Sequence, residues 1–271
     1  MTSPVGMVRN LEGYGGPTDD QIAFAKAYLA DGELDAAIAA LQSDPQRQAE
    51  RKEISERRKA EDWAQLGHYR AANADLKDQN VETVFIGDSI TEMWAIAQPD
   101  LFSNGVVNRG VSGQTSPQIL LRFMADVIAL RPKAVHLMCG VNDIAGNTGP
   151  TTPEDFKNNV CAMLDLARTN GIAVILGSIT PITALPWAID VGHPGAWVSE
   201  LNGWLNTLAA DRGMTYVDYF TCLADADGSF RSDLTRDGVH PQRSAYALMR
   251  DLLSAVLRAR GASEAWAMAN A

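Results

Sequence analysis

Cysteine is scarce in this sequence, and its spacing excludes the two structures that cysteines usually build. Only three occur among 271 residues, at Cys139, Cys161 and Cys222. An odd, scattered set supplies neither a disulfide framework nor the paired spacing of a zinc site. We therefore expect free, buried thiols in a reducing compartment, with no bound metal and no cofactor.

Basic residues are also in short supply. Lysine and arginine total 23 against 33 aspartates and glutamates, which gives a formal net charge of −10. A protein that binds nucleic acid needs a basic face to neutralise phosphates. We therefore expect a small molecule, and no nucleic acid, as the partner of this protein.

Long apolar runs are missing as well. No stretch approaches the roughly 20 apolar residues of a membrane-spanning helix, and the first residues lack the apolar core of a signal peptide. The sequence predicts no membrane span. From this sequence we expect a cytoplasmic protein, or a periplasmic or secreted one if a signal peptide has been removed.

What the sequence does contain, from about residue 79 to 260, is an alternation of short apolar segments with longer amphipathic ones. Strands are predicted at 81–86, 105–108, 134–139, 173–178 and 215–218, and helices at 116–130, 153–170, 198–212 and 242–259. This alternation predicts an α/β domain with a parallel sheet covered on both faces. Functional residues then gather at the carboxyl ends of the strands.

The first 78 residues form a separate N-terminal extension. Helical patterns occupy 19–30 and 33–41, and a long charged helix is predicted over 46–73, with Trp63 and Leu66 on one face. We expect these two side chains to pack on the core. The earlier helices pack on the same chain or on a second subunit of a homo-oligomer, and 261–271 is read as a C-terminal tail.

The segment Gly87-Asp88-Ser89 is the first candidate for chemistry. It follows the apolar run 84–86 and precedes a helix-compatible stretch at 90–97. A serine on such a strand-to-helix turn has its N–H at a helix N-terminus, where an anion is stabilised. The alternative is an ordinary turn, because short clusters of Gly, Asp and Ser are usually turns.

A serine hydroxyl needs a base, and the chain has only four histidines. His68 is expected to be solvated on a charged helix, and His136 to be a satisfied core residue in a strand. His193 lies in a Gly/Pro loop where it can line a pocket. His240 follows Asp237 by three residues, at a spacing that lets a carboxylate hold the imidazole tautomer and stabilise the imidazolium.

Two further loops offer donors for an oxyanion. Gly113 lies in a loop after an apolar segment, and its N–H can approach a ligand closely. Asn142 follows the strand at 134–139, and its amide can donate to a developing negative charge. Taken singly, these positions are equally consistent with a helix cap and an Asx turn.

Taken together, the blocks around Ser89, Gly113, Asn142 and His240 resemble those of the SGNH/GDSL hydrolases, in the same order. The resemblance implies a three-layer α/β/α, flavodoxin-like fold with a five-stranded parallel sheet. It also implies that Ser89 is the nucleophile, His240 the base and Asp237 the residue that orients it. The oxyanion hole would then comprise the N–H groups of Ser89 and Gly113 and the side chain of Asn142.

The substrate is indicated only by aromatic residues near these blocks. Trp187, Trp197 and His193 lie in the segment after the fourth predicted strand, and Trp94 follows Ser89 by about one helical turn. They are candidate walls of a small pocket, although the tryptophans would equally serve to bury the loop. A short-acyl, acetyl-type esterase, with O-acetylated carbohydrate among its substrates, is the leading hypothesis. The alternatives are a lysophospholipase or thioesterase, and a catalytically weak binding or scaffold protein.

Overall fold

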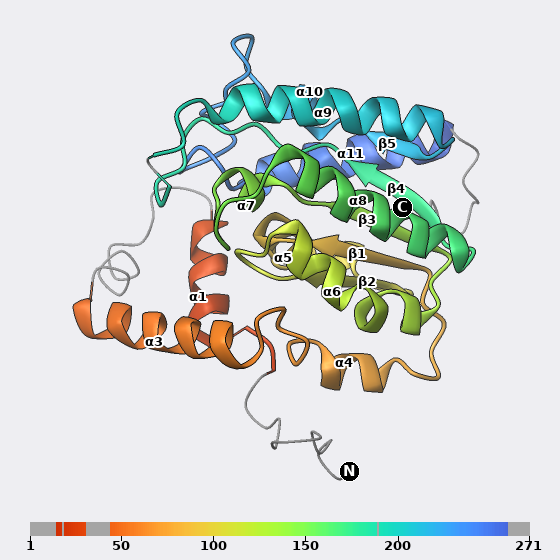
Figure 1. Ribbon diagram of the computed structural model, residues 1–271, viewed down its shortest axis with the longest axis horizontal. Helices are drawn as coiled ribbons and strands as arrows, with labels where there is room; N and C mark the ends of the chain where they lie inside the picture. Colours follow the sequence, from red (N-terminus) through yellow and green to blue (C-terminus); the bar gives the residue numbers. More distant parts are fainter. Residues whose placement is uncertain (1–14, 18, 31–43, 189, 260–271) are drawn as a thin grey trace.

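The computed structural model describes residues 15–17, 19–30, 44–188 and 190–259 (Figure 1). Its centre is a five-stranded parallel sheet with the strand order β2-β1-β3-β4-β5. The strands are β1 (Thr83–Gly87), β2 (Val106–Gly110), β3 (Ala134–Met138), β4 (Ala173–Gly177) and β5 (Thr215–Val217). This order is that of flavodoxin-like folds, so the predicted α/β architecture and all five predicted strands are confirmed.

Helices cover both faces of the sheet. On one face lie α6 (Ser116–Asp126), α8 (Pro153–Thr169) and α9 (Pro194–Asp211), and on the other lie α5 (Ser89–Ala97), α10 (Tyr219–Leu223) and α11 (Arg243–Ala259) (Figure 1). Shorter elements are η1 (Pro99–Leu101), η2 (Ile128–Leu130) and α7 (Val141–Ile144). Because both faces are covered, the central strand β1 carries a continuous apolar run rather than an alternating pattern, and Val84, Phe85 and Ile86 are fully buried.

The N-terminal extension contains α1 (Asp19–Tyr28), α3 (Pro45–Glu61) and α4 (Arg70–Asp75). Helix α1 packs against α5 of the same chain, with Ala25, Tyr28 and Leu29 buried (Figure 1). The helix predicted at 33–41 and the tail at 261–271 lie outside the described residues.

The prediction of one long helix over 46–73 is wrong. The helix ends at Glu61, and the carboxylate of Asp62 accepts hydrogen bonds from the N–H groups of Leu66 and Gly67, both at 2.8 Å. Gln65, between Asp62 and Leu66, adopts a left-handed conformation with φ of 54°. A side chain that bonds to nearby N–H groups in this way competes with the helical hydrogen-bond pattern, and the chain turns here.

This turn also overturns the expected packing of Trp63 and Leu66. Their side chains remain 39% and 42% exposed, and neither belongs to the buried core. The segment is held by polar bonds instead: Gln118 Nε2 on α6 donates to the carbonyl of Trp63 at 2.6 Å.

The three cysteines are free thiols, with Cys139 buried and the other two half-buried. None of the helices in the described part of the chain is long and apolar enough to cross a membrane.

Candidate active site

Ser89 begins helix α5 directly after strand β1. Asp88 caps the helix, since its Oδ1 accepts from the N–H of Ile90 at 3.0 Å. Gly87 is required at the end of the strand, because a Cβ there would lie 2.2 Å from the carbonyl oxygen of Met138. Burial raises the pKa of Asp88 to about 7. The turn therefore presents the Ser89 hydroxyl beside the positive end of a helix.

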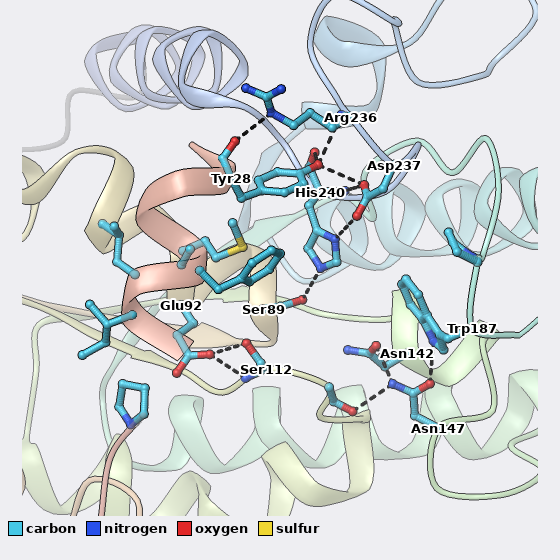
Figure 2. A pocket seen from close by; sticks show the side chains of 18 residues that line it. Tyr28, Ser89, Glu92, Ser112, Asn142, Asn147, Trp187, Arg236, Asp237 and His240 are labelled. Atoms are coloured by element: carbon cyan, nitrogen blue, oxygen red, sulfur yellow. Dashed lines mark hydrogen bonds and ion pairs between the residues drawn. The ribbon is translucent and has the colours of Figure 1, made fainter. Parts of the chain in front are cut away.

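His240 and Asp237 meet this hydroxyl from the loop before α11 (Figure 2). Ser89 Oγ lies 3.0 Å from His240 Nε2, and His240 Nδ1 lies 2.7 Å from Asp237 Oδ2. The other carboxylate oxygen, Asp237 Oδ1, accepts from the N–H groups of Val239 and His240 at 3.0 and 2.8 Å. Burial alone would raise the pKa of Asp237, but the hydrogen bonds and charge of His240 and these N–H groups lower it below the usual range.

The proposed oxyanion donors line the same cavity as Ser89 and His240. Gly113 adopts φ of +79°, which glycine tolerates without strain. The Asn142 amide is fixed at both ends: Nδ2 donates to Gln114 O at 2.9 Å, and Oδ1 accepts from Asn147 Nδ2 at 2.7 Å. Among the described residues Nδ2 has no second acceptor, so its other hydrogen is available to a ligand.

The cavity around Ser89 has a volume of about 820 Å³ and two unlike sides. One side is apolar and lies between α1 and α5, with Ile22, Phe24, Met93 and Ile96 among its lining residues. On the other side stands Trp187, whose Nε1 donates to Asn147 Oδ1 at 2.9 Å and whose ring centroid lies 6.0 Å from that of His240 (Figure 2). The cavity can thus hold one group beside the imidazole and another between the two helices.

Three of the four expected pocket residues are elsewhere. Trp94 is fully buried in the core, where its Nε1 donates to Gln98 Oε1 at 3.1 Å. Helix α9 begins at Pro194 rather than near 198, so Trp197 falls in its first turn and lines a separate cavity of about 160 Å³. His193 precedes that helix and is exposed. Only Trp187 lines the cavity at Ser89.

The remaining histidines are both buried. His136 is a core residue as predicted, but only one of its ring nitrogens is satisfied: Nε2 lies 2.9 Å from the hydroxyl of Tyr219, whereas Nδ1 has no hydrogen-bond partner among the described residues. Burial lowers the pKa of His136 to about 3. The expectation that His68 is solvated is wrong, because it is only 7% exposed and lies 3.6 Å from Glu92 Oε1. The helix break at Asp62 turns His68 toward the core.

Two polar residues that support this site carry no recognisable signal in the sequence. Arg122 on α6 is fully buried and donates to Gly87 O at 2.9 Å and to Gln114 Oε1 at 2.6 Å. One guanidinium thereby joins the turn before Ser89 to the loop of Gly113. Tyr28, in the N-terminal extension, contacts the loop of Asp237 and His240.

The sequence matches the model of the GDSL-like Lipase/Acylhydrolase family over residues 85–248, which is more than half of the chain. The chain belongs to this family. The resemblance seen in the ordered blocks is therefore confirmed, and membership places the chain among the carboxylic ester hydrolases. Helix α1 lies outside the matched residues.

Solved structures of two family relatives are similar over nearly their whole length. A protein of Bacteroides fragilis NCTC 9343 assigned as an acylhydrolase is 37% identical, with a TM-score of 0.70, covering 73% of this chain and 99% of its own. A GDSL-like lipase of Bacteroides thetaiotaomicron VPI-5482 is 34% identical, with a TM-score of 0.68, covering 73% of this chain and 100% of its own.

A curated relative matches only in part. The uncharacterized lipoprotein YqeF of Bacillus subtilis (strain 168) is 34% identical over 80 residues, which make up 28% of this chain. The match spans about a third of that protein's length, 33%.

Proposed function

We propose that this protein hydrolyses carboxylic esters through an acyl-enzyme formed on Ser89. The observation that carries the proposal is the hydrogen-bonded row of Ser89, His240 and Asp237 facing one cavity. Ser89 Oγ attacks the ester carbonyl while His240 Nε2 takes its proton, and Asp237 stabilises the imidazolium that forms. A fully assembled row of this kind argues against a protein that only binds its ligand.

The rest of the cycle uses the same groups. The tetrahedral intermediate collapses, and the departing alkoxide takes the proton from His240, which leaves an acyl group on Ser89. Water then gives a proton to His240 and attacks the acyl carbonyl, and the carboxylic acid leaves as Ser89 recovers its proton. The N–H groups of Ser89 and Gly113 and the amide of Asn142 stabilise the oxyanion in both halves.

The proposed oxyanion role of Asn142 predicts a specific kinetic loss. In Asn142→Ala, kcat should fall by about 10²–10³-fold. KM should change little, because the lost hydrogen bond strengthens only in the transition state. The measurement is steady-state hydrolysis of a p-nitrophenyl ester by the variant and the wild type.

A matched control separates this role from simple support of the loop. Asn147→Ala removes the hydrogen bonds of Asn147 to Asn142 Oδ1, Gly113 O and Trp187 Nε1 but keeps the Asn142 amide itself, so its loss in kcat should be smaller. If both variants lose the same amount, Asn142 acts through the loop and is no oxyanion donor.

The shape of the cavity revises the expected substrate. The short-acyl prediction assumed that Trp187 and Trp197 close a small pocket, but Trp197 lines a different cavity. A volume of about 820 Å³ with one apolar side suits a longer chain. We propose an ester with an unbranched acyl chain of medium length, because the side of the cavity between α1 and α5 is apolar.

The two sides of the cavity suggest how such an ester lies. The departing oxygen must come within reach of His240 Nε2 to receive its proton, so the alcohol group belongs beside His240 and Trp187. The acyl chain then extends the other way, between α1 and α5, against Ile22 and Ile96.

This orientation predicts the chain-length preference. Across p-nitrophenyl esters from acetate to decanoate, kcat/KM should first rise by up to about fourfold per added methylene, as ~0.8 kcal/mol is gained for each one buried. It should fall once the chain outgrows the cavity. Ile22→Trp should shorten the preferred chain and leave acetate hydrolysis intact, whereas Leu121→Trp, at an exposed position on α6, should change neither. A profile that declines from acetate onward would restore the short-acyl hypothesis.

A further inference from the structure

Helix α1 ends in a tyrosine that contacts the loop of Asp237 and His240. Tyr28, the last residue of α1, is only 5% exposed, and its ring meets that of His240 edge-on at a centroid distance of 6.0 Å. The residues in contact are more than 200 positions apart in the sequence. Figure 2 shows α1 beside the cavity, with Tyr28 at its upper end and directed at Asp237 and His240.

The hydroxyl of Tyr28 forms hydrogen bonds with three residues of this loop. It accepts from the N–H of Arg236 at 3.2 Å. It lies 3.1 Å from Asp237 Oδ1 and 2.9 Å from the carbonyl oxygen of His240, and it donates its single hydrogen to this pair of acceptors. Burial, and then the charge of Asp237, raise the pKa of Tyr28 above its usual range, so the hydroxyl remains a donor.

The loop holds the helix in return. Arg236 Nε donates to the carbonyl of Tyr28 at 3.0 Å, and Nη2 donates to that of Ala30 at 2.7 Å. Carbonyls at a helix C-terminus lack partners within the helix, and a cation there is favourable. The end of α1 and the loop 236–240 are therefore clamped to each other from both sides.

We propose that Tyr28 is a positioning residue for the reaction: it holds the loop 236–240 so that His240 Nε2 faces Ser89 Oγ. The inference rests on the proposed acyl-enzyme mechanism. If Tyr28 positions His240, turnover depends on α1, a helix outside the matched family region, because a small misplacement of a catalytic group costs much of the rate.

Tyr28→Phe tests this role, because it keeps the ring and removes only the hydroxyl. We expect kcat to fall about tenfold, as the loss of a hydrogen bond to a charged group implies, with KM within about twofold of the wild type. The rate of Ser89 labelling by a fluorophosphonate should fall in parallel. In addition, the proton NMR signal of His240 Nδ1–H should move, because its carboxylate partner has lost a donor.

Controls distinguish the failure of this inference from that of the proposed function. Tyr216→Phe, on β5 and outside the cavity lining, should match the wild type in all three measurements. All variants are assayed well below their melting temperatures. If Ser89→Ala stays active, the acyl-enzyme mechanism itself fails. If Ser89→Ala is inactive but Tyr28→Phe keeps the wild-type kcat and NMR signal, the mechanism stands and Tyr28 has no positioning role. A raised KM with unchanged kcat would likewise overturn the proposal and leave α1 as a wall of the cavity.

Discussion

Ser89→Ala is expected to lower kcat on the order of 10⁶-fold, because among the described residues Ser89 has the hydroxyl that hydrogen-bonds to His240 Nε2. His240→Ala should cost about as much, since Ser89 lies 3.0 Å from His240 Nε2 and has no other base within reach among the described residues. The double variant should lose hardly more than either single one, because nucleophile and base act as a unit. The measurement is single-turnover and steady-state hydrolysis of a p-nitrophenyl ester.

Covalent labelling completes this test. A fluorophosphonate should modify the wild type at Ser89, leave Ser89→Ala unmodified and react slowly with His240→Ala. EDTA should leave wild-type turnover intact, because serine, histidine and aspartate carry every proposed step. Turnover retained by Ser89→Ala, or lost on chelation and restored by zinc, would contradict the mechanism.

Asp237→Asn is expected to lower kcat by about 10⁴-fold. The reason lies in the two carboxylate oxygens. Oδ1 accepts from the N–H groups of Val239 and His240, so an asparagine must turn its carbonyl oxygen toward them. Its NH₂ group then faces His240 Nδ1, which can only accept, and the ring proton moves to Nε2. The imidazole can no longer receive the proton of Ser89.

The control for Asp237→Asn is Asp233→Asn, the same change at an exposed carboxylate that pairs with Arg231. It should leave kcat near the wild-type value, because an exposed ion pair contributes little. A kcat for Asp237→Asn within about tenfold of wild type would mean that Asp237 does not set the tautomer of His240.

The parts of the fold that could be predicted are those with a local signal. Strand β1 (Thr83–Gly87) is buried along its whole length because helices cover both faces of the sheet, and its apolar run at 84–86 is visible in the sequence. Ser89, Gly113 and Asn142 each come after a predicted strand. The carboxyl ends of parallel strands share one edge of the sheet, so the strands alone predicted that these residues lie at that edge. The spacing of Asp237 and His240 is equally local.

The parts that could not be predicted depend on where a helix begins or on contacts between distant segments. Trp197 leaves the expected pocket because α9 begins four residues earlier than its apolar pattern indicated. The helix break after Glu61 results from the side chain of Asp62. Aspartate also occurs within helices, so its presence alone did not predict the break. Tyr28 meets Asp237 across 209 positions of sequence, a distance over which no periodic pattern extends.

The separation in sequence between Ser89 and His240, the proposed nucleophile and base, also bears on how the protein folds during synthesis. Synthesis runs from the N-terminus, so the turn of Ser89 and the donors at Gly113 and Asn142 leave the ribosome before the loop 236–240. His240, which hydrogen-bonds to Ser89, is synthesised 151 positions later. Closing so long a loop is slow in folding, although its entropic cost grows only gradually with length. A nascent chain that has paired only its first strands therefore still lacks the proposed base, and under the proposed mechanism Ser89 becomes reactive only once the loop 236–240 lies beside it.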